Sequence, residues 1–197
     1  MGRFEGLAVL VTGATGGFGR RVCERLAENG AHLVLSDLDP KPVEKLAASL
    51  DTETVVLGGD IAGEELSEQL VRLAVDRFGR LDVAINNAGI AQSFVRLAQV
   101  PSDEARRVID IDLMGVFYAM KHQLPQMERQ HRQTGRGGVI VNIASVAGLV
   151  GAERLSVLFG GQAWRCRAHP LGRGRIFQEG RARERGLPGL CPHRHGE

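Results

Sequence analysis

A glycine-rich run near the start of the sequence has the spacing of a loop that binds phosphate. Within V-T-G-A-T-G-G-F-G-R (11–20), Gly13, Gly17 and Gly19 are spaced G-x-x-x-G-x-G. Glycine has no Cβ, so the backbone can turn tightly and a ligand can approach it closely. Where such a run joins a buried strand to a helix, the helix N-terminus also favours a negatively charged group. The run therefore predicts a pyrophosphate-binding loop, and the alternative is a simple glycine-rich turn.

An acidic residue closes the next apolar run. Asp37 ends H-L-V-L-S-D (32–37), at a distance from Gly19 that is typical of an acid that binds ribose. A carboxylate there accepts hydrogen bonds from the adenosine ribose hydroxyls and repels a 2′-phosphate. No basic residue lies between Gly13 and Gly19 to offset that repulsion. The pattern favours NAD over NADP, and the alternative is an ordinary acid in a surface turn.

Short apolar runs alternate with helical patterns along the chain, and these elements must position the loop and the acid. Alternation of this kind predicts right-handed βαβ units around a parallel sheet. The strands are apolar throughout, as expected when helices cover both faces. We therefore expect an α/β fold with a Rossmann-like, doubly wound parallel sheet. The expected strands are 7–13, 32–37, 54–60, 81–89 and 137–145, and the expected helices are 17–29, 41–50, 64–78 and about 102–130.

The bulk composition limits the class of protein. A chain of 197 residues with 43% hydrophobic and 24% charged residues predicts one globular domain, with or without a tail. No run approaches the ~18 apolar residues of a membrane span, and no signal peptide is evident, so we expect a cytoplasmic protein with no membrane partner. Cys23, Cys166 and Cys191 are too scattered for a disulfide framework. The run C-P-H-R-H (191–195) lacks the paired spacing of a zinc site, so we expect no metal.

The composition changes abruptly after Val157. Residues 1–157 carry 17 basic and 20 acidic side chains, whereas residues 158–197 carry 8 basic and 3 acidic side chains. The only Trp of the chain also lies in residues 158–197. We expect an incomplete nucleotide-binding domain in 1–157 and an aberrant Arg/Gly-rich tail in 158–197 that packs poorly. A basic tail can also be a nucleic-acid-binding arm. The Arg residues are interleaved with Gly, Pro and His and with few aromatics, which favours no nucleic-acid partner.

Four motifs, in order along residues 1–157, resemble the classical short-chain dehydrogenase/reductase family. They are Thr12-Gly13-x-x-x-Gly17-x-Gly19, Asp60-Ile61, N-N-A-G (86–89) and G-G-V-I-V-N-I-A-S-V-A-G (137–148). The resemblance implies hydride transfer between a nicotinamide and an alcohol or ketone substrate, with NAD as the cofactor. It implies that Ser145 is catalytic and hydrogen-bonds the substrate oxygen. The implied cofactor-binding residues are Thr12, Gly13, Thr15, Gly16, Gly17, Phe18, Gly19, Asp37, Leu38, Asp60, Ile61, Asn87, Ala88 and Gly89.

The chain departs from the family pattern at three positions. The family often has an asparagine on the long helix, which positions a water for proton relay, and Asp112 stands there. The family's general acid/base is a tyrosine followed four residues later by a lysine, and these positions hold Leu158 and Gln162. Tyr118 is the only tyrosine, and its spacing to Ser145 is wrong. The alternative function is therefore a catalytically dead dinucleotide-binding fragment. The C-terminal strands and helices are missing or scrambled, so we do not expect the family's homo-oligomer to assemble.

Back-translation offers an interpretation of the change near position 158. With suitable synonymous codons, a one-base shift inside codon 158 gives Y-S-A-A-K-H-G, which puts tyrosine and lysine codons over positions 158 and 162. In the same shifted frame, residues 178–190 permit K-K-G-V-R-V-N-A-V-S-P-G, a strand motif at the family's spacing. We therefore hypothesise a frameshift, a single-base insertion at or near codon 158. The alternative is a divergent natural tail.

Overall fold

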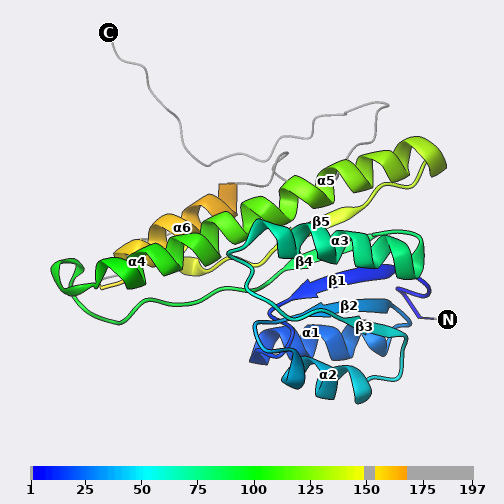
Figure 1. The fold of residues 1–197 in the computed structure, drawn as a ribbon, viewed down its shortest axis with the longest axis horizontal. Helices are drawn as coiled ribbons and strands as arrows, with labels where there is room; N and C mark the ends of the chain where they lie inside the picture. Colours follow the sequence, from blue (N-terminus) through cyan, green and yellow to red (C-terminus); the bar gives the residue numbers. More distant parts are fainter. Residues whose placement is uncertain (1, 149–153, 168–197) are drawn as a thin grey trace, which may run out of the picture.

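The computed structural model describes residues 2–148 and 154–167, and their strands form one parallel sheet (Figure 1). The strand order is β3-β2-β1-β4-β5. The strands are β1 (Ala8–Thr12), β2 (His32–Ser36), β3 (Thr54–Val56), β4 (Val83–Asn86) and β5 (Val139–Asn142). The helices are α1 (Gly17–Ala27), α2 (Pro40–Ala48), α3 (Glu64–Phe78), α4 (Ser102–Ile109), α5 (Gly115–Thr134) and α6 (Ser156–Arg167), with short helical turns η1 (Leu97–Gln99), η2 (Asp110–Met114) and η3 (Val146–Gly148).

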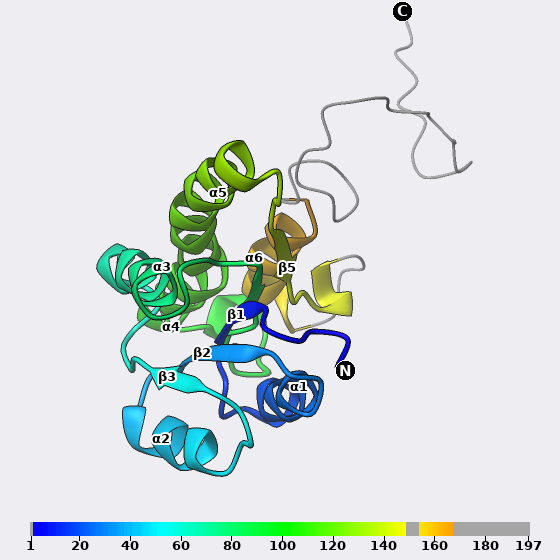
Figure 2. The same cartoon turned by 90° about the vertical axis from the view of Figure 1, so that its right-hand side faces the viewer.

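Helices cover both faces of the sheet at β1 and β2, which explains why these strands are apolar without alternation. At β5 one face is open, because Val139 and Val141 are exposed while Ile140 is buried. Along β1, Val9 and Val11 belong to the core cluster that includes residues of α1 and α2. Leu10 points to the opposite face and joins the cluster that includes residues of α3 and α5. Figure 2 shows α1 and α2 on one side of the sheet and α3 and α5 on the other. The predicted doubly wound parallel sheet is confirmed.

The strands end earlier than the apolar runs from which they were predicted. The run 81–89 forms β4 only to Asn86, and the run 137–145 forms β5 only to Asn142. Beyond these points the pairing is reduced to single bonds, such as Ile143 N to Asn86 O at 3.0 Å. The polar ends of the runs therefore become loops at the carboxyl edge of the sheet, where ligands of open α/β sheets bind.

The predicted helix 102–130 is present but contains a π-helical turn. Helix α4 continues through η2 into α5 without leaving the helical path. Single π-helical turns inside α-helices are frequent at functional sites. Asp112 lies in this turn and is completely buried.

Helix α6 shows that residues 158–167 of the tail that we expected to pack poorly are helical. It packs against α4, η2 and η3. Its buried residues, Leu158, Gly161, Gln162 and Arg165, have the i, i+3, i+4, i+7 spacing of one helical face. Two of the four are long polar residues, so the apolar periodicity that reveals most helices is absent. The predicted boundary at 157/158 thus falls inside a helix, and residues 168–197 of the predicted tail lie outside the described residues.

Candidate active site

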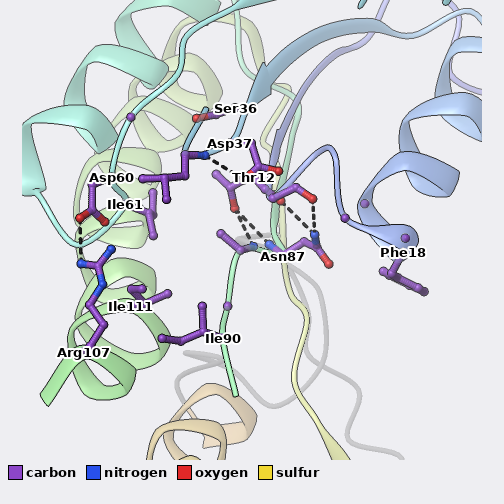
Figure 3. A pocket seen from close by; sticks show the side chains of 18 residues that line it. Thr12, Phe18, Ser36, Asp37, Asp60, Ile61, Asn87, Ile90, Arg107 and Ile111 are labelled. Carbon is purple, nitrogen blue, oxygen red and sulfur yellow. Dashed lines mark hydrogen bonds and ion pairs between the residues drawn. The ribbon is translucent and has the colours of Figure 1, made fainter. Parts of the chain in front are cut away.

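A cleft of about 410 Å³ opens at the carboxyl ends of β1, β2 and β4 (Figure 3). That volume is within the range of small-molecule and cofactor sites, about 300–1,000 Å³. Every predicted cofactor-binding residue except Thr15 lines it. The cleft also contains five residues that were not predicted. Its lining is Thr12, Gly13, Gly16, Gly17, Phe18, Gly19, Ser36, Asp37, Leu38, Gly59, Asp60, Ile61, Asn87, Ala88, Gly89, Ile90, Arg107 and Ile111.

The glycine loop joins β1 to α1, as its sequence predicted. Gly13 has φ +65°, a conformation that side chains with a Cβ rarely adopt. A Cβ on Gly19 would lie 2.0 Å from the Gly13 carbonyl oxygen, whereas a Cβ on Gly17 would have no neighbour within 4 Å. Helix α1 begins after Gly16 with no side-chain cap. The N–H groups of its first turn therefore remain available to a ligand in the cleft.

Asn87 and Thr12 fasten the glycine loop to the loop after β4. The Asn87 amide nitrogen Nδ2 donates to the carbonyl oxygens of Thr12 (3.1 Å) and Gly13 (2.9 Å). In return, Thr12 Oγ1 accepts from the backbone N–H groups of Asn87 (3.1 Å) and Ala88 (3.2 Å). Figure 3 shows these bonds beside the cleft. The two loops that wall the cleft are thus held as one unit.

The Asp37 carboxylate lies in the cleft at the end of β2 and is held by Thr15. Thr15 donates to Asp37 Oδ2 from its backbone N (2.9 Å) and its hydroxyl (2.5 Å). Leu38 N donates to Oδ1 at 2.8 Å. Thr15 does not line the cleft, so its contribution is to orient the carboxylate that does.

Asp60 and Arg107 form an ion pair in the wall near Asp37. Arg107 Nη1 lies 2.8 Å from Asp60 Oδ2, and Ala62 N donates to Oδ1 at 3.0 Å. The hydrogen bond from Arg107 is the main reason that the pKa of Asp60 lies below its ordinary value. Arg107 was not predicted, because its partner lies far away in the sequence on the loop before α3.

The two predicted catalytic residues lie outside the lining of the cleft. Ser145 is exposed after β5, and its Oγ accepts from Ala147 N at 3.2 Å. Asp112 is enclosed: Oδ1 accepts from Ile90 N at 2.9 Å and Oδ2 accepts from Gln162 Nε2 at 2.8 Å. The catalytic roles of Ser145 and Asp112 stay predictions.

The positions at which the family carries its tyrosine and lysine lie on α6. Leu158 and Gln162 are one helical turn apart and both are buried. Leu158 has no ionisable group, and Gln162 is hydrogen-bonded to Asp112. Tyr118 lies on α5 with its ring against Phe117, and Lys121 forms an ion pair with Glu64 at 2.6 Å. Tyr118 and Lys121 therefore do not replace the tyrosine and lysine that the family carries at positions 158 and 162.

Among the residues that the structure describes, no group of three His, Cys, Asp or Glu is arranged to hold a metal ion. None of the helices in residues 2–148 and 154–167 combines the length and the apolar character needed to cross a membrane.

Comparison with known proteins assigns the family. The family model for short chain dehydrogenases matches residues 7–158. An uncharacterized oxidoreductase of Thermotoga maritima is 34% identical over 157 residues, covering 78% of this chain and 59% of the relative. A 2,5-dichloro-2,5-cyclohexadiene-1,4-diol dehydrogenase of Sphingobium indicum is 37% identical over 151 residues, covering 77% and 59%. The structure of an NAD⁺-bound xylitol dehydrogenase superposes with a TM-score of 0.74 and 33% identity, covering 82% of this chain and 61% of that one.

The chain therefore belongs to the short chain dehydrogenase family. It spans about three fifths of the length of these relatives, whose names are those of oxidoreductases.

Proposed function

We propose that the cleft binds a nicotinamide dinucleotide, with NAD(H) preferred over NADP(H). The observation that carries this proposal is the position of Asp37 beside the glycine loop, with both carboxylate oxygens already oriented. Ribose hydroxyls would donate to this carboxylate, and a 2′-phosphate would be repelled by it. Arg107 is the only basic residue in the described lining, and it is paired with Asp60.

The residues present fit such a ligand. The pyrophosphate would lie against the uncapped first turn of α1, above Gly17, where no protein atom fills the space that a Cβ would occupy. Asp37 would hold the adenosine ribose at one end. The second nucleoside would then lie toward Ala88, Gly89 and Ile90 at the other end. The bound nicotinamide supplies the hydride chemistry.

We further propose that the family activity is hydride transfer between the nicotinamide and an alcohol or ketone, and that this chain binds the cofactor without that turnover. Ser145 can donate a hydrogen bond to a substrate oxygen. Proton transfer needs an ionisable group within hydrogen-bonding reach of that oxygen. Leu158 cannot supply one, and Gln162 has no charge with which to lower a phenol pKa from near 10.

The frameshift hypothesis agrees with the position of α6. A tyrosine and a lysine at positions 158 and 162 would share one face of α6, next to η2. Sequencing the gene across codons 150–165 tests the hypothesis. An extra base relative to the genes of close relatives supports it, and an uninterrupted frame shared with those relatives contradicts it.

Substitution of Asp37 tests the proposed cofactor preference. We expect Asp37→Ala to weaken NADH binding by about tenfold and to narrow the difference between NADH and NADPH, because a charge-assisted hydrogen bond contributes about 1.5–3 kcal/mol. Calorimetric titration with NADH and with NADPH measures both affinities. Asp51→Ala, which removes an exposed acid outside the cleft, is the matched control. Equal affinities of wild type and Asp37→Ala for NADH would contradict the proposal.

A further inference from the structure

Arg165 on α6 is a buried cation that bridges three separate segments of the chain. Its Nε donates to the Asp112 carbonyl oxygen at 2.6 Å and its Nη1 donates to the Ile143 carbonyl oxygen at 2.9 Å. Its Nη2 donates to the Ala88 carbonyl oxygen at 2.5 Å and lies 3.7 Å from Asp112 Oδ1. The side chains of Arg165 and Asp112 are only 2% and 0% exposed.

Burial of this guanidinium is tolerated because its donors are satisfied. A buried charge is expensive unless it is paired and hydrogen-bonded. Here one carboxylate opposes the charge and three carbonyl oxygens occupy the planar fork of donors. Burial lowers the pKa of Arg165, and the charge of Asp112 acts in the opposite direction. The fork geometry also means that lysine, a point charge, cannot make the same set of bonds.

The segment that Arg165 fixes is a wall of the cleft. Ala88, Gly89 and Ile90 line the end of the cleft that is farther from Asp37 (Figure 3). A Cβ on Gly89 would lie 3.1 Å from Asp112 Oδ1 and 3.3 Å from Arg165 Nη2, so the wall rests directly on this pair. Ile90 N donates to the same Asp112 oxygen. Arg165 thus holds the wall twice, through the Ala88 carbonyl and through Asp112.

We propose that Arg165 is a positioning residue for the nicotinamide half of the cofactor. It acts through Ala88 and Asp112 and does not contact the ligand. The inference rests on the proposed function, which places the adenosine half at Asp37 and the pyrophosphate on the glycine loop. In the part of the cleft that the described residues line, the Ala88–Ile90 end is then left for the nicotinamide nucleoside. Affinity for the whole dinucleotide should therefore depend on Arg165, and affinity for the adenosine half should not.

Calorimetric titration of the full chain with NADH and with ADP separates the two halves. We expect Arg165→Met to weaken NADH binding by about tenfold or more, the loss that follows when one hydrogen-bonded contact is misaligned, and to leave ADP binding within about twofold. Arg165→Lys should give a smaller loss with the same selectivity. Arg132→Met, on the exposed end of α5, is the matched control and should change neither affinity.

Three results would overturn the inference. Unchanged NADH affinity in Arg165→Met and Arg165→Lys would show that the wall does not need this cation. Equal losses for NADH and ADP, with a lower melting temperature, would show a purely structural role. Binding of neither ligand by the wild-type chain would overturn the proposed function together with the inference. If the Arg165 variants do not fold, Asp112→Asn takes their place, because it removes the negative charge beside Arg165 and keeps an acceptor for Ile90 N. Weaker binding of NADH with unchanged binding of ADP would again support the inference, and any other result would overturn it.

Discussion

The hydroxyl of Thr15 lies 2.5 Å from the Asp37 carboxylate, and this bond joins the glycine loop to the end of β2. The same carboxylate oxygen also accepts from Thr15 N, so the glycine loop and Asp37, for which we propose contacts to the pyrophosphate and the ribose, are fixed relative to each other. The acid is therefore oriented before any ligand arrives, which reduces the entropy lost on binding.

Loss of the Thr15 hydroxyl should weaken nucleotide binding. Thr15→Val keeps the side-chain volume and the backbone donor but removes one hydrogen bond to Asp37, which is expected to lower affinity for both NADH and ADP by about threefold to tenfold. Thr15→Ser retains the hydroxyl and should bind as wild type does. Titration calorimetry measures all three proteins. Identical affinities for Thr15→Val and wild type would show that Asp37 does not need this support.

Gly19 and Gly17 should differ sharply in tolerance of a methyl group. A Cβ on Gly19 would be 2.0 Å from the Gly13 carbonyl oxygen, so Gly19→Ala should lower the free energy of unfolding by about 1–3 kcal/mol through overpacking. Gly17→Ala meets no protein atom and should unfold at the wild-type denaturant concentration. Urea unfolding followed by circular dichroism compares them. Equal stability of the two variants would mean that the packing at Gly19 is looser than described.

The ion pair between Arg107 and Asp60 should make stability depend on pH. Because Arg107 holds the folded-state pKa of Asp60 below its unfolded value, the pair stabilises above the unfolded pKa near 3.8 and the effect is lost as pH falls through the folded pKa. Both side chains are partly exposed, so Arg107→Gln should cost at most about 1 kcal/mol at pH 7. That difference from wild type should shrink to zero in strong acid.

Urea unfolding between pH 7 and the acid limit of folding measures the effect. Arg106→Gln, which neutralises the exposed neighbour of Arg107, is the control and should show no such trend. A difference for Arg107→Gln that persists unchanged into acid would rule out the ion pair as its cause.

Two substitutions on α6 should create the missing general acid/base, which in alcohol oxidation accepts the hydroxyl proton. We expect the double variant Leu158→Tyr/Gln162→Lys to oxidise secondary alcohols at least about a hundredfold faster than the parent chain, the lower end of what general acid–base catalysis contributes. The matched control is Leu158→Phe/Gln162→Lys, which has the same ring without the hydroxyl. NADH absorbance gives the rates. If the phenylalanine control is as fast as the tyrosine variant, proton transfer at position 158 is not what the chain lacks.

The glycine loop and Asp37 could be predicted because their chemistry is local in the sequence. Gly13 and Gly19 lie where a strand meets a helix, and Asp37 follows the next strand. This spacing by itself indicates how such a site binds a dinucleotide. The sheet was predictable for a similar reason, since its apolar strands leave few alternative arrangements. The exact ends of the strands were harder to predict, because strand pairing stops gradually, with single hydrogen bonds beyond the strands at positions such as Ile143.

Arg107 and Arg165 could not be predicted because their partners are distant in the sequence. Arg107 on α4 pairs with Asp60 on the loop before α3, and no local sequence pattern indicates that contact. Helix α6 was missed because its buried face carries Gln162 and Arg165, which periodicity methods score as exposed. These polar side chains can be buried because the Asp112 carboxylate and three backbone carbonyl groups accept their hydrogen bonds.

We propose that this member of the family binds its dinucleotide but lacks the general acid/base that exchanges a proton with the substrate oxygen. The most direct measurement titrates the wild-type chain with NAD⁺ by calorimetry and then records absorbance at the NADH band with a panel of secondary alcohols. We predict saturable binding at one site per chain, with NADP⁺ binding more weakly, and no detectable NADH formation. Turnover at ordinary enzyme rates, or a folded chain that gives no binding heat with NAD⁺, would contradict it.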